Sequence, residues 1–221
     1  MTELARLSVN PTSRSALRDL ADPVALHRRV MAAFPPLDTT DPRAVLGVLW
    51  RLDTGFARDP ILLVQSHEPG DWTSLPDGWF LEANSKRIDA ALDSLDRSRR
   101  LRFLLRANAS RKIKTMSTGD GTRRNGQRVP LRSEASALAW LEGRAASAGF
   151  VLAAGPSGVA VRVQTEGAAM GRRGDRVVTV QATRFEGLLE VTDPELLARA
   201  VRSGIGPAKA FGCGLLSLAP A

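Results

Sequence analysis

Two stretches of the 221-residue chain carry residues whose types and spacing could do chemistry. The first surrounds His27, an imidazole that titrates near neutral pH and is followed directly by Arg28 and Arg29. His27 could act as a general acid or base, and either guanidinium could bind a neighbouring phosphate. The alternative is a partly buried histidine with a structural role, because His27 shares a helical face with Met31 and Phe34.

The second stretch is the glycine-rich loop, residues 203–214 (SGIGPAKAFGCG), in which glycines bracket Lys209. Glycine permits positive φ and close backbone approach, so successive N–H groups can form an anion-binding concavity to which Lys209 adds an ammonium. The glycines are Gly204, Gly206, Gly212 and Gly214. The residue order of a Walker loop is missing, and the alternative is a glycine-terminated helix followed by a loop.

Basic residues elsewhere in the chain are candidates for contact with a polyanion. The chain has 31 Lys+Arg against 23 Asp+Glu, a net charge of +8, and only four of the basic residues are lysines. Between Arg97 and Arg132 twelve basic residues and one acid give a local net charge of +11. This block predicts phosphate contacts with nucleic acid, although a solvated charged surface is the alternative. The expected contacts are Arg106, Arg111, Lys112, Lys114, Arg123, Arg124 and Arg128.

A further basic motif is Gly171-Arg172-Arg173-Gly174, which is predicted to form a turn between two strands. Such a turn can insert Arg172 and Arg173 into a groove of a nucleic acid. An exposed turn whose charges only aid solubility is the alternative.

Several classes of protein are excluded or disfavoured by what the sequence lacks. Cys213 is the only cysteine, so no internal disulfide can form, and with His27 and His67 it offers no zinc-type spacing. The sequence therefore predicts no metal and no cofactor. It has no signal-peptide pattern and no apolar run of the ~20 residues that a membrane helix needs. We expect a cytoplasmic protein with no membrane partner.

Hydrophobic patterning predicts the elements that must position these groups. An Asp-Pro pair, Asp22-Pro23, favours a helix start that would carry His27. In the first half we expect strands at 4–10, 44–53, 61–67 and 101–107, and helices at 22–34 and 88–95. This order, β-α-β-β-α-β, is that of a ferredoxin-like domain.

The second half repeats the same order of elements. Strands are expected at 127–131, 159–165, 177–191 and 215–218, with helices at 133–148 and from Asp193-Pro194 to Gly204. The predicted fold is therefore α+β, with two tandem ferredoxin-like domains at 1–115 and 127–221. A polar, Gly-rich linker at 116–126 separates them, and the glycine-rich loop lies in the second.

Aromatic residues are few: seven Phe, four Trp and no tyrosine. Stacking of single-stranded bases is therefore a less suitable mode of binding than contact with the backbone and grooves of a duplex or hairpin.

Five collinear segments of the chain resemble the CasE family, the CRISPR repeat-processing endoribonucleases of type I-E systems. The most specific is GIGPAKAFGCGLLSLAP at the C-terminal end. The others are DLADPVALHRRVMAAFP, RFLLRANASRKIK, QRVPLRSEASALAWL and RFEGLLEVTD. The resemblance thus covers nearly the whole chain.

The resemblance implies a tandem ferredoxin-like fold of the repeat-associated (RAMP) type and a specific reaction. The 2′-OH attacks the adjacent phosphate at the 3′ side of a CRISPR repeat hairpin, without metal, and a 5′-hydroxyl leaves. The family's catalytic histidine falls on His27, and its RNA-inserted basic hairpin falls on Arg172 and Arg173. The processed guide RNA stays bound, and the protein works with the other subunits of the Cascade complex.

One position departs from the family pattern. The family commonly carries a tyrosine three residues before the histidine, where this chain has Val24. Without a phenol, His27 would carry more of the acid–base work, and Lys209 or a neighbouring Arg would stabilise charge on the phosphorane. Two alternatives remain open: a non-catalytic repeat-binding subunit of Cascade, and a basic RNA-binding protein of ribosomal type.

Overall fold

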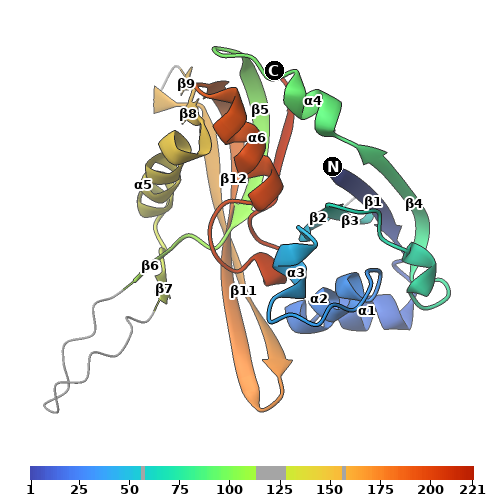
Figure 1. The fold of residues 1–221 in the computed structure, drawn as a ribbon. Helices are drawn as coiled ribbons and strands as arrows, with labels where there is room; N and C mark the ends of the chain where they lie inside the picture. Colours follow the sequence, from blue (N-terminus) through green and yellow to red (C-terminus); the bar gives the residue numbers. More distant parts are fainter. Residues whose placement is uncertain (56–57, 113–127, 156–157) are drawn as a thin grey trace, which may run out of the picture.

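The computed structural model describes residues 1–55, 58–112, 128–155 and 158–221. Its main strands form two antiparallel sheets, each with helices packed on one face (Figure 1). The predicted α+β class is therefore confirmed. Each sheet with its helices is called here a unit, and the two units lie side by side.

The first unit is built on a four-stranded sheet of order β2-β3-β1-β4. Its elements are β1 (Glu3–Val9), α1 (Arg14–Leu20), α2 (Pro23–Met31), α3 (Pro42–Val45), β2 (Leu49–Gly55), β3 (Arg58–Ser66), the 3₁₀ turn η1 (Trp72–Ser74) and β4 (Phe80–Arg87). Ala5, Leu7 and Val9 alternate along β1 and are buried, as expected for a strand with one face on a core.

The second unit contains a sheet of order β11-β12-β5-β13, with β8 also paired to β12. Its elements are β5 (Arg100–Ala107), α5 (Glu134–Ala145), the 3₁₀ turn η2 (Ala146–Ala148), β8 (Phe150–Leu152), β11 (Val161–Arg173), β12 (Arg176–Val191), α6 (Pro194–Ser203), the 3₁₀ turn η3 (Lys209–Phe211) and β13 (Leu216–Pro220). β9 (Ala154–Gly155) pairs with β10 (Gly158–Val159) in a separate antiparallel pair. Leucine and phenylalanine side chains of this sheet pack on α5 and α6.

The strand predicted at 101–107 does not complete the first sheet. This strand, β5, is central in the second sheet, where it pairs with β12 and β13. The first sheet is completed instead by β4, which was not predicted and pairs with β1. The predicted helix at 88–95 is the short connector α4 (Asp89–Asp93), and the predicted strand at 44–53 begins only at Leu49, after α3.

The predicted domain limits therefore cut across a sheet. β5 lies in the predicted range 1–115 and pairs with strands of the range 127–221. The expected strand at 127–131 is β7 (Arg128–Pro130), which pairs only with β6 (Ser110–Lys112) in a two-stranded ribbon. The expected linker at 116–126 lies outside the described residues.

Candidate functional site

His27 lies in α2, at the surface where this helix packs against β11 and η3. Asp22 begins the helix because its Oδ1 accepts the N–H groups of Val24 (2.7 Å) and Ala25 (3.1 Å), and Pro23 occupies the first turn. The predicted Asp-Pro start is confirmed. It fixes the helical phase, and His27 is left half-buried beside the second unit.

The environment of His27 favours the neutral imidazole. Burial, followed by the positive charges of Arg43 and Arg173, lowers the pKa of His27 from 6.5 to about 4, against a smaller opposing effect of Asp41. Nδ1 is buried and has no hydrogen-bond partner among the described residues. Nε2 is therefore the ring nitrogen left for proton exchange with a substrate, and at pH 7 the imidazole is neutral.

Lys209 lies in η3, within the glycine-rich loop that approaches α2. Its Nζ donates to the carbonyl oxygen of Ser203 at 2.6 Å, so the last residue of α6 holds the side chain. Burial and the charge of Arg43 lower the pKa of Lys209. Lys209 and His27 are thus brought to the same interface from opposite halves of the sequence.

Arg43 is a site residue that was not predicted from the sequence. Its Nη1 donates to the carbonyl oxygen of Val48 at 3.1 Å, and its Nη2 lies 3.4 Å from Oδ2 of the exposed Asp41. The charge of Arg43 influences both His27 and Lys209. A signal was present: Asp41-Pro42 repeats the Asp-Pro helix start and predicts a structured turn here.

The hairpin β11–β12 brings the predicted arginines to the same helix. Gly171 is buried against α2, since a Cβ there would lie 2.3 Å from Oδ1 of Asp22 and 2.9 Å from Cγ2 of Val24. Arg172 and Arg173 follow at the exposed tip, which Figure 1 shows extending past α2. Val24, where the family commonly has tyrosine, is itself buried in this contact.

The glycines of the loop are needed for packing rather than for an open anion cradle. All four have positive φ, and a Cβ would meet Leu49 at Gly204, Trp140 at Gly206 and Trp50 at Gly212. Two of their N–H groups are already used: that of Gly204 donates to Ala200 (2.8 Å) and that of Gly214 to Arg106 (2.7 Å). Protein atoms therefore fill much of the space predicted for an anion.

Two arginines predicted to bind RNA are occupied by carboxylates. Nε of Arg29 lies 2.6 Å from Oδ2 of the buried Asp19, which also accepts the indole N–H of Trp79 at 2.9 Å. Nε of Arg106 lies 2.7 Å from Oε2 of Glu166. Sequence alone could not assign these partners, because ten and 60 residues separate them along the chain. Both arginines hold protein elements together.

The remaining predicted arginines and lysines are on exposed surface or outside the described part of the chain. Arg28 is exposed on α2. Arg111, Lys112 and Arg128 are exposed on the β6–β7 ribbon, where Lys112 and Arg128 lie directly opposite each other. Like charges in this arrangement repel, so an anion between the strands would stabilise the ribbon. Lys114, Arg123 and Arg124 lie outside the described residues.

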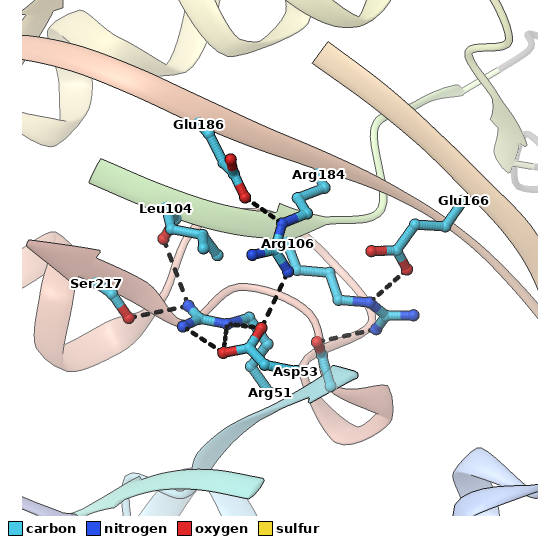
Figure 2. Close-up of polar contacts among 9 residues, drawn as sticks. Arg51, Asp53, Leu104, Arg106, Glu166, Arg184, Glu186 and Ser217 are labelled. Carbon is cyan, nitrogen blue, oxygen red and sulfur yellow. Dashed lines mark hydrogen bonds and ion pairs between the residues drawn. The ribbon is translucent and has the colours of Figure 1, made fainter. Parts of the chain in front are cut away.

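A cavity of about 800 Å³ is lined by residues of α1, α2, β2, β11 and β12. An ion pair between the units, Arg184–Asp53, borders it, and Arg51 of the first unit shares the same carboxylate (Figure 2). Arg51 binds Asp53 through both Nε (2.9 Å) and Nη2 (2.9 Å), and Nη1 of Arg184 reaches the same carboxylate at 3.0 Å. Arg51 also donates to Oγ of Ser217 at 2.9 Å. The units are thus joined by a polar network at one end of the cavity.

Two kinds of feature are absent from the described residues. No group of three or more His, Cys, Asp or Glu side chains lies close enough to hold a metal ion. No helix in the described ranges has the length and apolar character required to cross a membrane.

Known proteins resemble the chain over almost its full length. The family model described as "CRISPR associated protein" matches residues 4–220. The CRISPR-associated endoribonuclease Cse3 of Thermus thermophilus is 36% identical over 225 residues, which cover 98% of this chain and 99% of that protein. The Cascade subunit CasE of Escherichia coli is 39% identical over 124 residues, 54% of this chain and 58% of CasE.

A solved structure is similar to the same extent. Thermus thermophilus Cse3 bound to an RNA that represents a pre-cleavage complex superposes with a TM-score of 0.78 at 36% identity, covering 99% of each chain. The sequence match and this structural similarity both extend over the two units. This chain belongs to the family of CRISPR-associated proteins.

Proposed function

We propose that this protein is an endoribonuclease that binds the hairpin of a CRISPR repeat and cleaves precursor CRISPR RNA at the 3′ side of the stem. The observation that carries the proposal is the meeting of a neutral His27 with Arg43, Arg173 and Lys209, in a chain 36% identical to an endoribonuclease over 98% of its length. A neutral imidazole among cations suits a reaction on a phosphodiester.

The reaction uses the RNA's own 2′-hydroxyl as the nucleophile. Nε2 of His27 takes the proton of the 2′-OH while the 2′-oxygen attacks the adjacent phosphorus. The bond from phosphorus to the 5′-oxygen breaks, which leaves a 2′,3′-cyclic phosphate, and the 5′-oxygen takes up a proton from water to leave as a hydroxyl. Lys209 supplies positive charge for the phosphorane, and no metal takes part. One positioned acid–base group contributes roughly 10²–10⁴-fold.

The RNA is held by the exposed basic residues around this site. The β11–β12 hairpin presents Arg172 and Arg173 beside His27, and Arg28 lies on the same helix as the histidine. The β6–β7 ribbon adds Arg111, Lys112 and Arg128, whose mutual repulsion phosphates would relieve. Contacts of this kind position a duplex without reading its sequence.

After cleavage the protein keeps the guide RNA and serves as a subunit of Cascade. The support is its similarity to CasE, which is named as a Cascade subunit. We place this activity in the cytoplasm, because the buried Cys213, whose pKa burial raises to about 11, suits a reducing compartment.

A second candidate is a repeat-binding subunit without nuclease activity. The observation in its favour is Val24, which is buried against Gly171 and offers no phenol where the family commonly has one. It predicts tight binding of the repeat hairpin with no product.

Cleavage of the cognate repeat RNA in EDTA distinguishes these functions. We expect the wild-type protein to cut once at the base of the stem, and His27→Ala to bind with nearly unchanged affinity and to cut at least ~10²-fold more slowly. A 2′-deoxy nucleotide at the cleaved position should block the reaction. Intact RNA at saturating wild-type protein would exclude the nuclease, and cutting of the deoxy substrate would exclude 2′-OH attack.

A further inference from the structure

Arg106 is placed where it can control the shape of the glycine-rich loop. It projects from β5 toward the cavity between the units (Figure 2). Its Nη1 donates to the carbonyl oxygens of Phe211 (3.2 Å) and Gly212 (3.0 Å), and its own carbonyl accepts the N–H of Gly214 at 2.7 Å. Side chain and backbone of one residue thus fix the C-terminal half of the loop.

Glu166 holds Arg106 from the opposite side, at a β-bulge in β11. Thr165 pairs with Thr183 and Ala168 with Gln181, so Glu166 and Gly167 together lie opposite one residue of β12. Such a bulge changes the direction of a side chain. Oε2 of Glu166 accepts from Nε of Arg106 at 2.7 Å, while Nε2 of Gln181 donates to the carbonyl oxygen of Glu166.

The same loop carries Lys209 near its middle, just before the segment that Arg106 contacts. The N–H of Ile205 donates to the carbonyl oxygen of Gly214 at 2.9 Å, which closes the loop, and Lys209 lies between these two residues with its Cγ 3.2 Å from the position of a Cβ on Gly214. A shift of the Phe211–Gly214 segment therefore moves Lys209 relative to His27. Farther along, β11 becomes the hairpin that bears Arg172 and Arg173.

We propose that Arg106 and Glu166 position Lys209 for RNA cleavage. The ion pair between them couples the bulge of the RNA-binding hairpin to the loop that carries Lys209. The inference rests on the proposed function, and it gives Arg106 a role different from direct RNA contact. The guanidinium suits the task because its planar fork reaches a carboxylate and two carbonyl groups at once, which a lysine ammonium cannot do in the same geometry.

The chain offers a matched control in the neighbouring pair Arg184–Glu186. Both pairs lie on the second sheet (Figure 2), but Arg106 and Glu166 come from different strands whereas Arg184 and Glu186 share β12. Nε of Arg184 contacts Glu186 and its Nη1 contacts Asp53, with no bond to the loop. We expect Glu166→Gln and Arg106→Lys to slow single-turnover cleavage at saturating protein by about 10- to 100-fold while RNA affinity changes less than threefold. Glu186→Gln should change neither quantity.

Amide hydrogen exchange of the free protein tests the structural step without RNA. Glu166→Gln and Arg106→Lys should raise exchange in residues 204–214, whereas Glu186→Gln should not. Unchanged exchange in the loop would overturn the proposal even if cleavage slowed.

A double-mutant cycle tests whether the pair acts through Lys209. If it does, Arg106→Lys should slow cleavage much less in a Lys209→Ala background than in the wild type. Fully additive effects would overturn the proposal, as would a Lys209→Ala variant that cleaves at the wild-type rate. A wild-type protein that never cleaves would instead refute the proposed nuclease, and the exchange measurement would still decide the coupling of Arg106 to the loop.

Discussion

His27 illustrates how the charge around one residue can prepare it for an anionic substrate. Burial and the nearby guanidinium groups of Arg43 and Arg173 disfavour the imidazolium. Phosphates of a bound RNA would neutralise these arginines and would themselves stabilise the imidazolium. Binding should therefore move the pKa of His27 upward, toward the range in which proton transfer at pH 7 is most efficient.

The lowered pKa of His27 also predicts how stability depends on pH. Below its unfolded value of 6.5 the unfolded chain binds a proton that the folded protein does not bind until about pH 4. The stability that depends on a neutral His27 is therefore fully present above pH 6.5 and is lost as the pH falls toward 4. Because the ring is only half-buried, we expect His27 to account for about 1–2 kcal/mol of this loss.

Urea denaturation at pH 7.5 and pH 4.5 measures this contribution. The wild type should lose more stability between the two pH values than His27→Asn does. The difference between the two losses is the contribution of His27 to the pH dependence. Equal losses in the two proteins would contradict a lowered pKa at this position.

At the residue scale, the sequence identified groups but not their partners. His27 and Lys209 were predicted because an isolated imidazole and a lysine among glycines are recognisable by type. Arg43 was missed because its importance depends on the folding of α3 beside α2. Arg106 was assigned to RNA because no residue near it in the sequence indicates that Glu166 is its partner. Long-range ion pairs have no signal in the spacing of residues along a single chain.

The hairpin β11–β12 presents its two arginines on opposite faces. Side chains alternate along a strand, so Arg173 shares a face with Gly171, which packs on α2, whereas Arg172 points the other way. Arg173, but not Arg172, affects the charge state of His27. Two adjacent arginines thus serve different parts of the substrate.

Substitution of each arginine should separate these roles. Arg173→Ala should raise the pKa of His27 and slow cleavage, since it removes a charge beside the imidazole. Arg172→Ala should weaken RNA binding severalfold and leave that pKa unchanged. Histidine NMR titration is well suited to the measurement, because His67 is the only other histidine and serves as an internal reference. Equal effects of the two variants on His27 would contradict the assignment of faces.

The packing of the glycine-rich loop gives a prediction at Gly212. It has φ +73°, and a Cβ would lie 2.5 Å from Cζ3 of the buried Trp50. Gly174, at the hairpin tip, has φ +59° with nothing within 4 Å. Gly174→Ala should therefore cost about 1 kcal/mol from backbone strain alone. Gly212→Ala should cost about 2–4 kcal/mol, because overpacking adds to that strain.

Urea denaturation of both variants at pH 7.5 gives their free energies of unfolding. The difference between them is the cost of the steric clash with Trp50 beyond backbone strain. A Gly212→Ala variant no less stable than Gly174→Ala would mean that Trp50 can move aside without loss.

Some elements could be predicted from sequence and others could not, for identifiable reasons. The helices α2 and α6 were found because each begins with an Asp-Pro pair and carries a regular apolar face. The edge strand β4 was missed because most of its residues, in FLEANSKR, are exposed and polar, so the alternation typical of a strand is absent. Without β4, β5 was assigned to the wrong sheet.

At the scale of the whole molecule, buried polar groups join the two units. The carboxamide of Gln65 donates to the carbonyl oxygens of Val201 (3.0 Å) and Arg202 (3.2 Å) at the end of α6. The side chain of Arg51 is only 3% exposed and depends on Asp53 for its charge partner. The units are therefore held in one register by directional bonds as well as by apolar contact.

Removal of Asp53 should destabilise this junction. Asp53→Ala leaves the guanidinium of Arg51 buried without its carboxylate and also releases Arg184. We expect a loss of about 2 kcal/mol, less than the ~3–5 kcal/mol typical of a fully buried pair because Asp53 is partly exposed. Denaturant unfolding measures it, with Asp59→Ala, an exposed carboxylate on the same cavity, as the control. Equal stability of the two variants would show that the Arg51 charge needs no partner.

Two tryptophans lie against the glycine-rich loop, so their intrinsic fluorescence reports on the conformation of the loop. Gly212 lies against the indole of Trp50 and Gly206 against that of Trp140, so two of the four tryptophans face the loop that carries Lys209. Indole emission changes in wavelength and intensity when a neighbouring group withdraws and water enters. Intrinsic fluorescence can therefore follow the loop in real time during RNA binding, without an attached dye.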